Sequence, residues 1–230
     1  EIIHNYNNLA FVYTPLHGTG IKLVPEALKR AGFTNVQIVE EQAIMDGNFP
    51  TVKSPNPEEK SALEMAINKA QKINADLVFA TDPDADRVGI AVKDSKNNFV
   101  LLNGNQTASV LTYYILEQWS KQNKFKGNEY IIKTIVTTEL LTKIAKKYQI
   151  EIFDVLTGFK YIAEIIRQNE GKKTYVCGGE ESYGFLIGDY VRDKDAVSAC
   201  LLIAEVAAWA RSQNKTIWDI LMDIYREFGL

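Results

Sequence analysis

Three aspartates stand at every second position in the segment TDPDADRVGI, directly after the apolar run ADLVFA. At this spacing the carboxylates of Asp82, Asp84 and Asp86 repel one another unless a cation or several hydrogen-bond donors offset their charge. Hard divalent cations prefer oxygen ligands, so a Mg²⁺ site explains the crowding. An acidic surface turn is the alternative, because D-x-D-x-D also occurs without a metal.

The neighbours of the aspartates narrow the chemistry. A calcium loop of the EF-hand type needs Gly at its sixth position and Glu at its twelfth, where this sequence has Arg87 and Lys93. Carboxylates beside an arginine suit octahedral Mg²⁺ that keeps phosphate oxygen or water as its other ligands, with Arg87 binding the anion. This pattern favours phosphoryl transfer. A phosphatase with Asp82 or Asp84 as its nucleophile is a rival interpretation.

The segment GGEESYGF, residues 178–185, has the composition of a sugar-binding loop. Its paired glycines let the backbone approach a ligand, and Glu180, Glu181 and Ser182 offer groups that bind hydroxyls. A tight turn with solvated acids is the alternative. On its own, the motif does not decide between the two.

Further loops carry residues suited to anions. In VRDKDAV, Arg192 and Lys194 precede a predicted helix start, where a phosphate or only solvated helix-cap charges would fit. TGFKY places Lys160 after a predicted strand, and TPLHGTG presents His17 after another. TPLHGTG is not a Walker loop, and His17 is either a phosphate contact or a hydrogen-bonded turn residue.

Alternating strands and helices must position these loops. The patterns predict strands at 9–14, 35–39, 75–80, 130–136, 151–155 and 173–178, a strand pair at 88–94 and 97–102, and helices at 21–32, 57–74, 107–119, 138–148, 158–169 and within 195–227. The fold class is therefore α/β, with two similar three-layer α/β/α domains and mixed, largely parallel sheets, at 1–103 and 104–230. Ligands of such sheets gather at the carboxyl ends of strands.

The composition excludes several classes of protein. Apolar residues make up 46% of the 230 residues and charged residues 24%, with a net charge of -3, as in an ordinary soluble globular protein. Scattered Lys and Arg argue against nucleic-acid binding. No apolar run reaches the length of a membrane span, and no signal segment opens the chain. Cys177 and Cys200 lack metal-ligand spacing, which favours reduced thiols in the cytoplasm.

Taken together, TPLHGTG, TDPDADRVGIAV, TGFKY, GGEESYGF and VRDKDAV resemble the α-D-phosphohexomutase family, most closely its phosphoglucomutase branch. Members have four domains; the first carries a phosphorylated serine in a TASHNP-like loop and the last a phosphate loop like RPSGTEPK, and neither motif occurs here. Ser109, in QTAS, lacks the following HNP and lies in a predicted helix, so it is not the nucleophile. The chain is therefore expected to be domains two and three of a longer protein, with domains one and four as partners.

The resemblance implies roles for individual residues. Asp82, Asp84 and Asp86 bind Mg²⁺ together with an oxygen of the phosphoserine. Arg87 lies beside that phosphate and, with Lys194 and His17, belongs to the catalytic group. Substrate-binding residues implied in the second unit are Glu180 and Ser182 at the ring hydroxyls, with Thr157, Gly158, Lys160 and Lys194.

The implied reaction converts glucose 1-phosphate to glucose 6-phosphate through glucose 1,6-bisphosphate. Mannose phosphates and pentose 1-phosphates are alternative substrates. A non-catalytic module that binds magnesium or sugar phosphate is the rival from another class. Without the serine and the terminal phosphate loop, the fragment alone is expected to be inactive.

Overall fold

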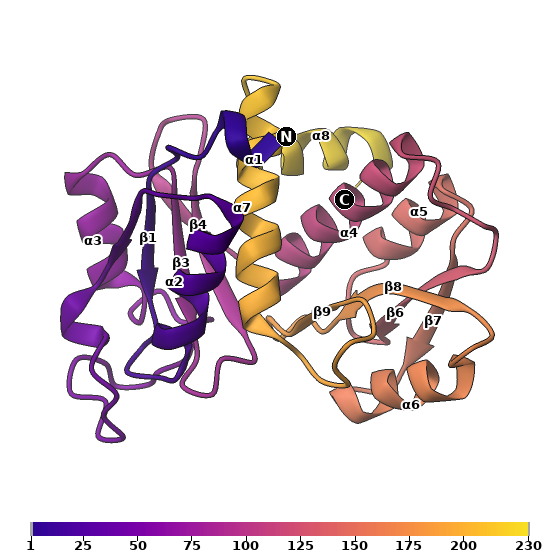
Figure 1. Ribbon diagram of the computed structural model, residues 1–230, viewed down its shortest axis with the longest axis horizontal. Coiled ribbons are helices and arrows are strands. Elements are labelled where there is room, and N and C mark those ends of the chain that lie inside the picture. The colour runs from indigo at the N-terminus through magenta and orange to yellow at the C-terminus, as the bar shows by residue number, and fades with distance from the viewer. Residues whose placement is uncertain (1, 230) are drawn as a thin grey trace.

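The computed structural model of the protein describes residues 2–229, which form two α/β units side by side (Figure 1). The first unit contains α1 (Ile2–Asn5), β1 (Phe11–Thr14), α2 (Gly20–Ala31), β2 (Val36–Ile38), the 3-10 helix η1 (Glu40–Gln42), α3 (Glu64–Lys72), β3 (Leu77–Thr81), β4 (Val88–Lys93) and β5 (Phe99–Leu102). The rest of the chain contains α4 (Gly104–Lys121), β6 (Glu129–Thr134), α5 (Leu140–Lys147), β7 (Glu151–Val155), α6 (Phe159–Asn169), β8 (Thr174–Gly179), β9 (Phe185–Ile187), α7 (Ala196–Ser212) and α8 (Ile217–Phe228).

The second sheet repeats the topology of the first four strands of the first sheet. The first has the order β2-β1-β3-β4-β5 and the second β7-β6-β8-β9. In each, the first strand in sequence pairs in parallel with the next two, and an antiparallel strand follows. This confirms the predicted class of two similar α/β/α units with mixed sheets. The predicted strand pair is also confirmed, because β4 and β5 are antiparallel.

Helices cover both faces of each sheet. Along the strands, alternate side chains point to opposite faces, so Val12 and Val78 pack with α3, whereas Phe11 and Phe79 pack with α2. In the second unit, α6 covers one face, and α4 and α5 cover the other. Figure 1 shows β1, β6 and β7 ending on the same side of the molecule.

Helix α7 lies between the two units. It packs against α2, β3 and β4 of the first unit and against α4, α8 and β9 of the second (Figure 1). Its sequence, AVSACLLIAEVAAWARS, is apolar on nearly every side, and such a helix is stable only when neighbours surround it. It therefore joins both units in one hydrophobic core.

Helix ends follow local signals. Gly32 ends α2 in the left-handed region, with φ of 109°. Asn103 and Gln106 form a reciprocal capping box at the start of α4. The Asp195 carboxylate accepts hydrogen bonds from the N–H groups of Val197 and Ser198 at the start of α7.

Two predicted elements differ markedly in extent, and α1, η1 and β9 were not predicted. The helix predicted at 57–74 begins only at Glu64, because residues 57–63 form turns with hydrogen bonds such as Ala62 N–H to the Glu59 carbonyl. The strand predicted at 130–136 ends at Thr134, where a turn begins that buries Thr137 and exposes Ile135 and Val136. Strand β9 has three residues, too few for an alternating pattern to reveal.

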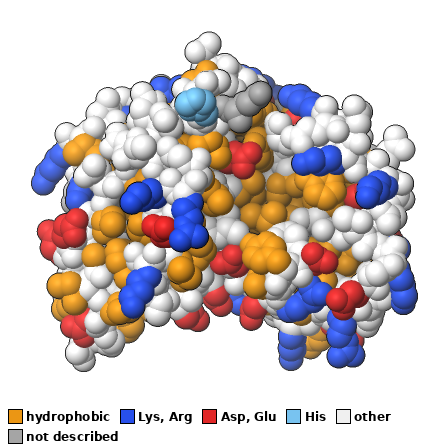
Figure 2. Space-filling model, in the orientation of Figure 1, with side chains coloured by type: hydrophobic (Ala, Val, Ile, Leu, Met, Phe, Trp, Pro, Cys, Tyr) orange, Lys and Arg blue, Asp and Glu red, His pale blue; other side chains and the backbone are white. Residues whose placement is uncertain are grey.

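Charge is spread over the surface. Figure 2 shows acidic and basic side chains interspersed on one face of the molecule rather than gathered by sign. Within residues 2–229, no helix is both long and apolar enough to cross a membrane.

Candidate metal and sugar-phosphate site

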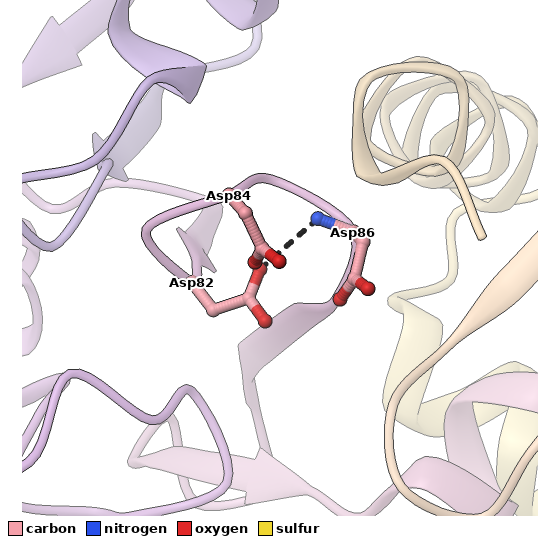
Figure 3. A group of neighbouring side chains, drawn as sticks. All are labelled: Asp82, Asp84 and Asp86. Carbon is pink, nitrogen blue, oxygen red and sulfur yellow. Dashed lines mark hydrogen bonds between the residues drawn. The ribbon is translucent and has the colours of Figure 1, made fainter. Parts of the chain in front are cut away.

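The three aspartates lie on the loop between β3 and β4, here called the aspartate loop (residues 82–87; Figure 3). One carboxylate oxygen from each lies within 4.8 Å of the others. Asp82 is buried, Asp86 half-buried and Asp84 exposed. Asp82 Oδ1 accepts hydrogen bonds from the backbone N–H groups of Asp86 at 3.1 Å and Arg87 at 3.0 Å. Ala85 turns the loop with φ of 59°.

Arg87 ties the loop to the rest of the first unit. Its Nε donates to Asp82 Oδ2 at 2.7 Å, and its Nη1 donates to Glu58 Oε1 at 3.1 Å. Burial lowers the pKa of Arg87, but the hydrogen bond and charge of Asp82, with the charge of Glu58, outweigh it and leave the pKa raised. The guanidinium is therefore charged and has a fixed orientation.

Asp82 lies in the opposite electrostatic situation. Burial raises its pKa, and the charge of Asp86 adds to this rise, while the hydrogen bonds from Arg87 oppose it. A bound cation would favour the charged carboxylate at this position. One more positive charge beside the loop would therefore stabilise the ionised carboxylates.

The aspartate loop contacts the second unit directly. Lys194 Nζ lies 2.9 Å from Asp86 Oδ2. Arg87 and Gly184 form an antiparallel bridge, and the N–H of Val88 donates to the Tyr183 carbonyl at 3.2 Å. The structure therefore brings the two predicted motifs, TDPDADR and GGEESYG, together.

Close backbone approaches fix the loop from both sides. A Cβ on Gly18 would lie 2.3 Å from the Pro83 Cα, so only glycine fits there. The Thr19 N–H donates to the Pro83 carbonyl at 2.8 Å, and the Ala196 N–H at the start of α7 donates to the Ala85 carbonyl at 3.1 Å.

Glu180 opens the second motif, here called the glutamate loop (residues 180–184). It is buried, with 6% exposure; Oε1 accepts the Gly158 N–H at 2.9 Å, and its own N–H donates to the Gly184 carbonyl at 2.9 Å. Burial raises the pKa of Glu180, against the hydrogen bond from Gly158 and the charge of Lys194.

Lys194 lies between the two loops. A Cβ on Gly184 would lie 2.2 Å from Lys194 Cδ, which shows how closely the lysine stem packs on the glutamate loop. Burial lowers the pKa of Lys194, but Asp86 and Asp193 outweigh it and raise the pKa. A cavity of about 570 Å³ opens beside it, lined among others by Leu23, Asp84, Asp86, Val191 and Arg192.

Other predicted residues lie further out. Thr157 and Lys160 are exposed beside Gly158, with Lys160 Nζ 4.9 Å from the centre of the Tyr161 ring. Ser182 is half-buried within the glutamate loop. The structure thus places Thr157 and Gly158 at the strand end that Glu180 contacts, whereas Lys160 turns to Tyr161.

His17 is engaged within the first unit. Its Nδ1 lies 2.9 Å from the Ile44 carbonyl oxygen and its Nε2 lies 2.8 Å from Thr51 Oγ1. A carbonyl oxygen only accepts, so His17 Nδ1 carries the proton and donates to Ile44. Nε2 then accepts a hydrogen bond from the Thr51 hydroxyl. The geometry is that of a hydrogen-bonded turn residue, and the catalytic role of His17 stays a prediction.

Similarity to known proteins follows the same division of the chain. A family model described as phosphoglucomutase/phosphomannomutase alpha/beta/alpha domain II matches residues 3–96, and the model for domain III of the same family matches residues 103–228. The chain belongs to the phosphoglucomutase/phosphomannomutase family. This confirms the family that the sequence motifs indicated.

Curated relatives of this phosphohexomutase chain are longer than it is. A phosphoglucomutase of Staphylococcus haemolyticus is 39% identical over 223 residues, and one of Staphylococcus aureus strain MRSA252 is 41% identical. The alignments cover 97% of this chain and 40% of each relative. The chain thus spans well under half the length of the curated relatives it matches.

Solved structures share the fold. A phosphoglucomutase/phosphomannomutase family protein from Burkholderia thailandensis superposes with a TM-score of 0.74 at 22% identity, over 94% of this chain and 43% of that one. An N-acetylphosphoglucosamine mutase from Aspergillus fumigatus, in complex with GlcNAc-6P and magnesium, gives a TM-score of 0.65 at 15% identity, over 94% and 49%.

The donor set of the phosphohexomutase aspartate loop fits a hard cation. All three candidate ligands are carboxylates, the oxygen ligands that Mg²⁺ prefers. Asp82 Oδ2 receives one hydrogen bond, from Arg87, so a lone pair remains for a metal. Asp84 is exposed, and Figure 3 shows its carboxylate pointing toward that of Asp82.

Sequence reasoning missed two supporting residues and left a third without a role. Glu58 orients Arg87, but its position after the Pro57 turn resembles an ordinary helix start. Lys133 is fully buried between Glu139 and Asp154, and a single lysine in the apolar strand EYIIKT gave a weak signal of this. By sequence, Glu181 is one of three polar residues in its motif, and nothing local distinguishes its role.

Proposed function

We propose that this chain is the central part of a phosphoglucomutase that interconverts glucose 1-phosphate and glucose 6-phosphate through a phosphoserine enzyme and glucose 1,6-bisphosphate. The observation that carries the proposal is the junction of the two loops, where Lys194 Nζ lies 2.9 Å from Asp86 Oδ2 and Arg87 bridges to Gly184. A phosphate at the aspartate loop would lie next to groups suited to sugar hydroxyls.

The residues of the aspartate loop would bind the metal ion and the phosphate. Asp82, Asp84 and Asp86 would hold Mg²⁺, which when bound supplies positive charge that stabilises the transferring phosphoryl group. Arg87, held by Asp82 and Glu58, binds oxygens of that phosphate.

The second unit would bind the substrate. Glu180 and Ser182 bind the sugar hydroxyls, with Thr157 and Gly158 at the adjacent strand end. Lys194 binds substrate phosphate or moves a proton at the attacking hydroxyl. Lys160 adds positive charge at the exposed edge of the site, beside Gly158. His17 is the remaining member of the proposed catalytic group, and the Ile44 carbonyl and the Thr51 hydroxyl hold its ring.

Glucose phosphates are the proposed substrates because the relatives named above, at 39% and 41% identity, are phosphoglucomutases. We propose residues 1–103 and 104–230 as two domains of a longer protein, with α4 capped at Asn103. The chain alone should catalyse no mutase turnover, because the nucleophilic serine would belong to another domain. Its buried free thiols, Cys177 and Cys200, suit the reducing cytoplasm.

Calorimetric titration with Mg²⁺, with and without glucose 1,6-bisphosphate, tests the proposal. Asp84→Ala should lose Mg²⁺ binding and Glu180→Ala should lose sugar binding, whereas Glu164→Ala, on the exposed side of α6, should behave as wild type. Unchanged Mg²⁺ binding by Asp84→Ala would contradict the metal assignment. Turnover by the isolated chain would contradict the divided site.

A further inference from the structure

Glu181 stands between the two residues assigned to the sugar, but its side chain is engaged elsewhere. Its Oε2 accepts hydrogen bonds from Thr134 Oγ1 at 3.0 Å and Thr137 Oγ1 at 3.2 Å. Both threonines are buried, with 0% and 2% exposure. These hydroxyls belong to the turn after β6 (residues 134–138), on a neighbouring strand of the second sheet.

That turn is held in place independently of Glu181. The fully buried Lys133 donates from Nζ to the Thr137 carbonyl at 3.3 Å, and it pairs with Glu139 at 2.9 Å and Asp154 at 3.0 Å. Burial lowers the pKa of Lys133, but these two carboxylates outweigh it and raise the pKa. The N–H of Thr138 donates to Asn105 Oδ1 at 3.0 Å, which fixes the turn to α4.

The opposite side of the glutamate loop has no free space. A Cβ on Gly104 would lie 1.9 Å from the Glu181 carbonyl oxygen, so the backbone at Glu181 is pressed against the first residue of α4. Adjacent carboxylates of one loop therefore contact different strand ends: Glu180 reaches Gly158 after β7, and Glu181 reaches the turn after β6.

We infer that Glu181 is a positioning residue, which binds the glutamate loop to the Thr134 and Thr137 hydroxyls and so directs Glu180 and Ser182 toward the sugar. The sugar in this statement rests on the proposed function above. The Glu181 carboxylate acts through the loop conformation and does not contact the ligand. The turn after β6, fixed by Lys133, is the support on which the sugar-binding loop rests.

Hydrogen exchange on the free chain tests the positioning itself. In the Thr134→Val/Thr137→Val double variant, the Glu180 N–H, which donates to the Gly184 carbonyl, should exchange about tenfold faster, the order of effect of losing a charge-assisted hydrogen bond. The control, Thr34→Val, removes a hydroxyl that donates to the Asn7 carbonyl in the first unit and should leave this exchange unchanged. Unchanged exchange in the double variant would overturn the inference.

Binding of glucose 1,6-bisphosphate, measured by calorimetry, separates positioning from direct contact. Glu181→Ala should weaken binding about tenfold in the wild-type background, and it should add nothing in the Thr134→Val/Thr137→Val background, because coupled residues act as one unit. Glu181→Gln keeps an acceptor for both hydroxyls and should restore most of the affinity. Additive losses would overturn the inference, since they would mean that Glu181 contacts the sugar.

The two readouts distinguish the inference from the proposed function. If the wild-type chain binds no glucose 1,6-bisphosphate but the Glu180 N–H responds as expected, the positioning role stands and the sugar assignment fails. If the bisphosphate binds but neither readout responds to the threonine variants, the sugar assignment stands and the positioning role fails. Should the double variant not fold, Glu181→Ala against Glu181→Gln gives the same exchange comparison.

Discussion

Lys194 of the second unit forms an ion pair with Asp86 of the first, with Nζ 2.9 Å from Oδ2. Both side chains are partly shielded, at 16% and 29% exposure. The pair connects the proposed metal site to the proposed sugar site through one contact. The Lys194 ammonium group also neutralises part of the negative charge that would otherwise attract a divalent cation.

Lys194→Met should therefore raise the affinity of the chain for Mg²⁺. Removing a cation that competes for Asp86 leaves the three carboxylates less neutralised, and the gain should be at most about tenfold, because partly exposed ion pairs are weak. Calorimetric titration with Mg²⁺ alone gives the affinity. Lys160→Met is the matched control, since Lys160 lies over Tyr161. Weaker Mg²⁺ binding would mean that Lys194 assembles the aspartates.

Asp82 and Asp84 should differ in what they contribute to folding. Asp82 is buried and accepts three hydrogen bonds from Asp86 and Arg87, so Asp82→Ala should lower the free energy of unfolding by about 2–4 kcal/mol. Asp84 is exposed, and Asp84→Ala should change it by less than about 0.5 kcal/mol.

Urea unfolding of the two variants measures these free energies, and Mg²⁺ titration should show that both lose metal binding. The combination separates a ligand role from a structural one. Equal destabilisation by the two substitutions would contradict a structural role of Asp82 that Asp84 lacks.

Gly104→Ala probes the contact between α4 and the glutamate loop without removing any polar group. A methyl group 1.9 Å from the Glu181 carbonyl oxygen must displace the loop, at a cost of about 1–3 kcal/mol in stability. Alanine stabilises a helix more than glycine does, so a loss of stability in this variant would be caused by the clash. Gly47→Ala, with nothing within 4 Å of its Cβ, is the control. Wild-type stability and sugar-phosphate binding in Gly104→Ala would show that the loop moves freely.

Much of the fold could be predicted from local patterns. The strand EIFDV, residues 151–155, was placed with its observed bounds, because a short apolar run between two amphipathic helices has few alternatives. The start of α3 could not be predicted, because Pro57 and the acids after it also form the turn that brings Glu58 to Arg87. Local sequence does not distinguish a helix start from a loop held by a distant arginine.

The site was predictable by position but not by contact. Strand-end placement indicated Asp82 and Glu180, yet the pairing of Asp86 with Lys194 spans more than a hundred residues and depends on how α7 packs. An all-round apolar helix does not show in its sequence which sheet it covers. The support of Glu181 by Thr134 and Thr137 is equally hidden, because threonine is common in any strand.

Glu180 should make the stability of the chain depend on pH in a defined direction. Burial raises its pKa above the ordinary value, so the folded chain retains a proton that the unfolded chain releases. The contribution of Glu180 to the free energy of unfolding is therefore fully present below the ordinary pKa of the unfolded chain. That contribution is lost as the pH rises through the raised pKa of the folded chain. Above the raised pKa, the ionised carboxylate costs stability.

Glu180→Gln should accordingly be more stable than wild type at neutral pH, with the difference shrinking as the pH falls through the pKa of Glu180. The amide oxygen can still accept the Gly158 N–H, so the comparison isolates the charge. Urea midpoints across an acidic to neutral pH series measure the difference, and Glu164→Gln on α6 should show none. A less stable Glu180→Gln at neutral pH would mean that Gly158 and Lys194 stabilise the ionised carboxylate more than burial destabilises it.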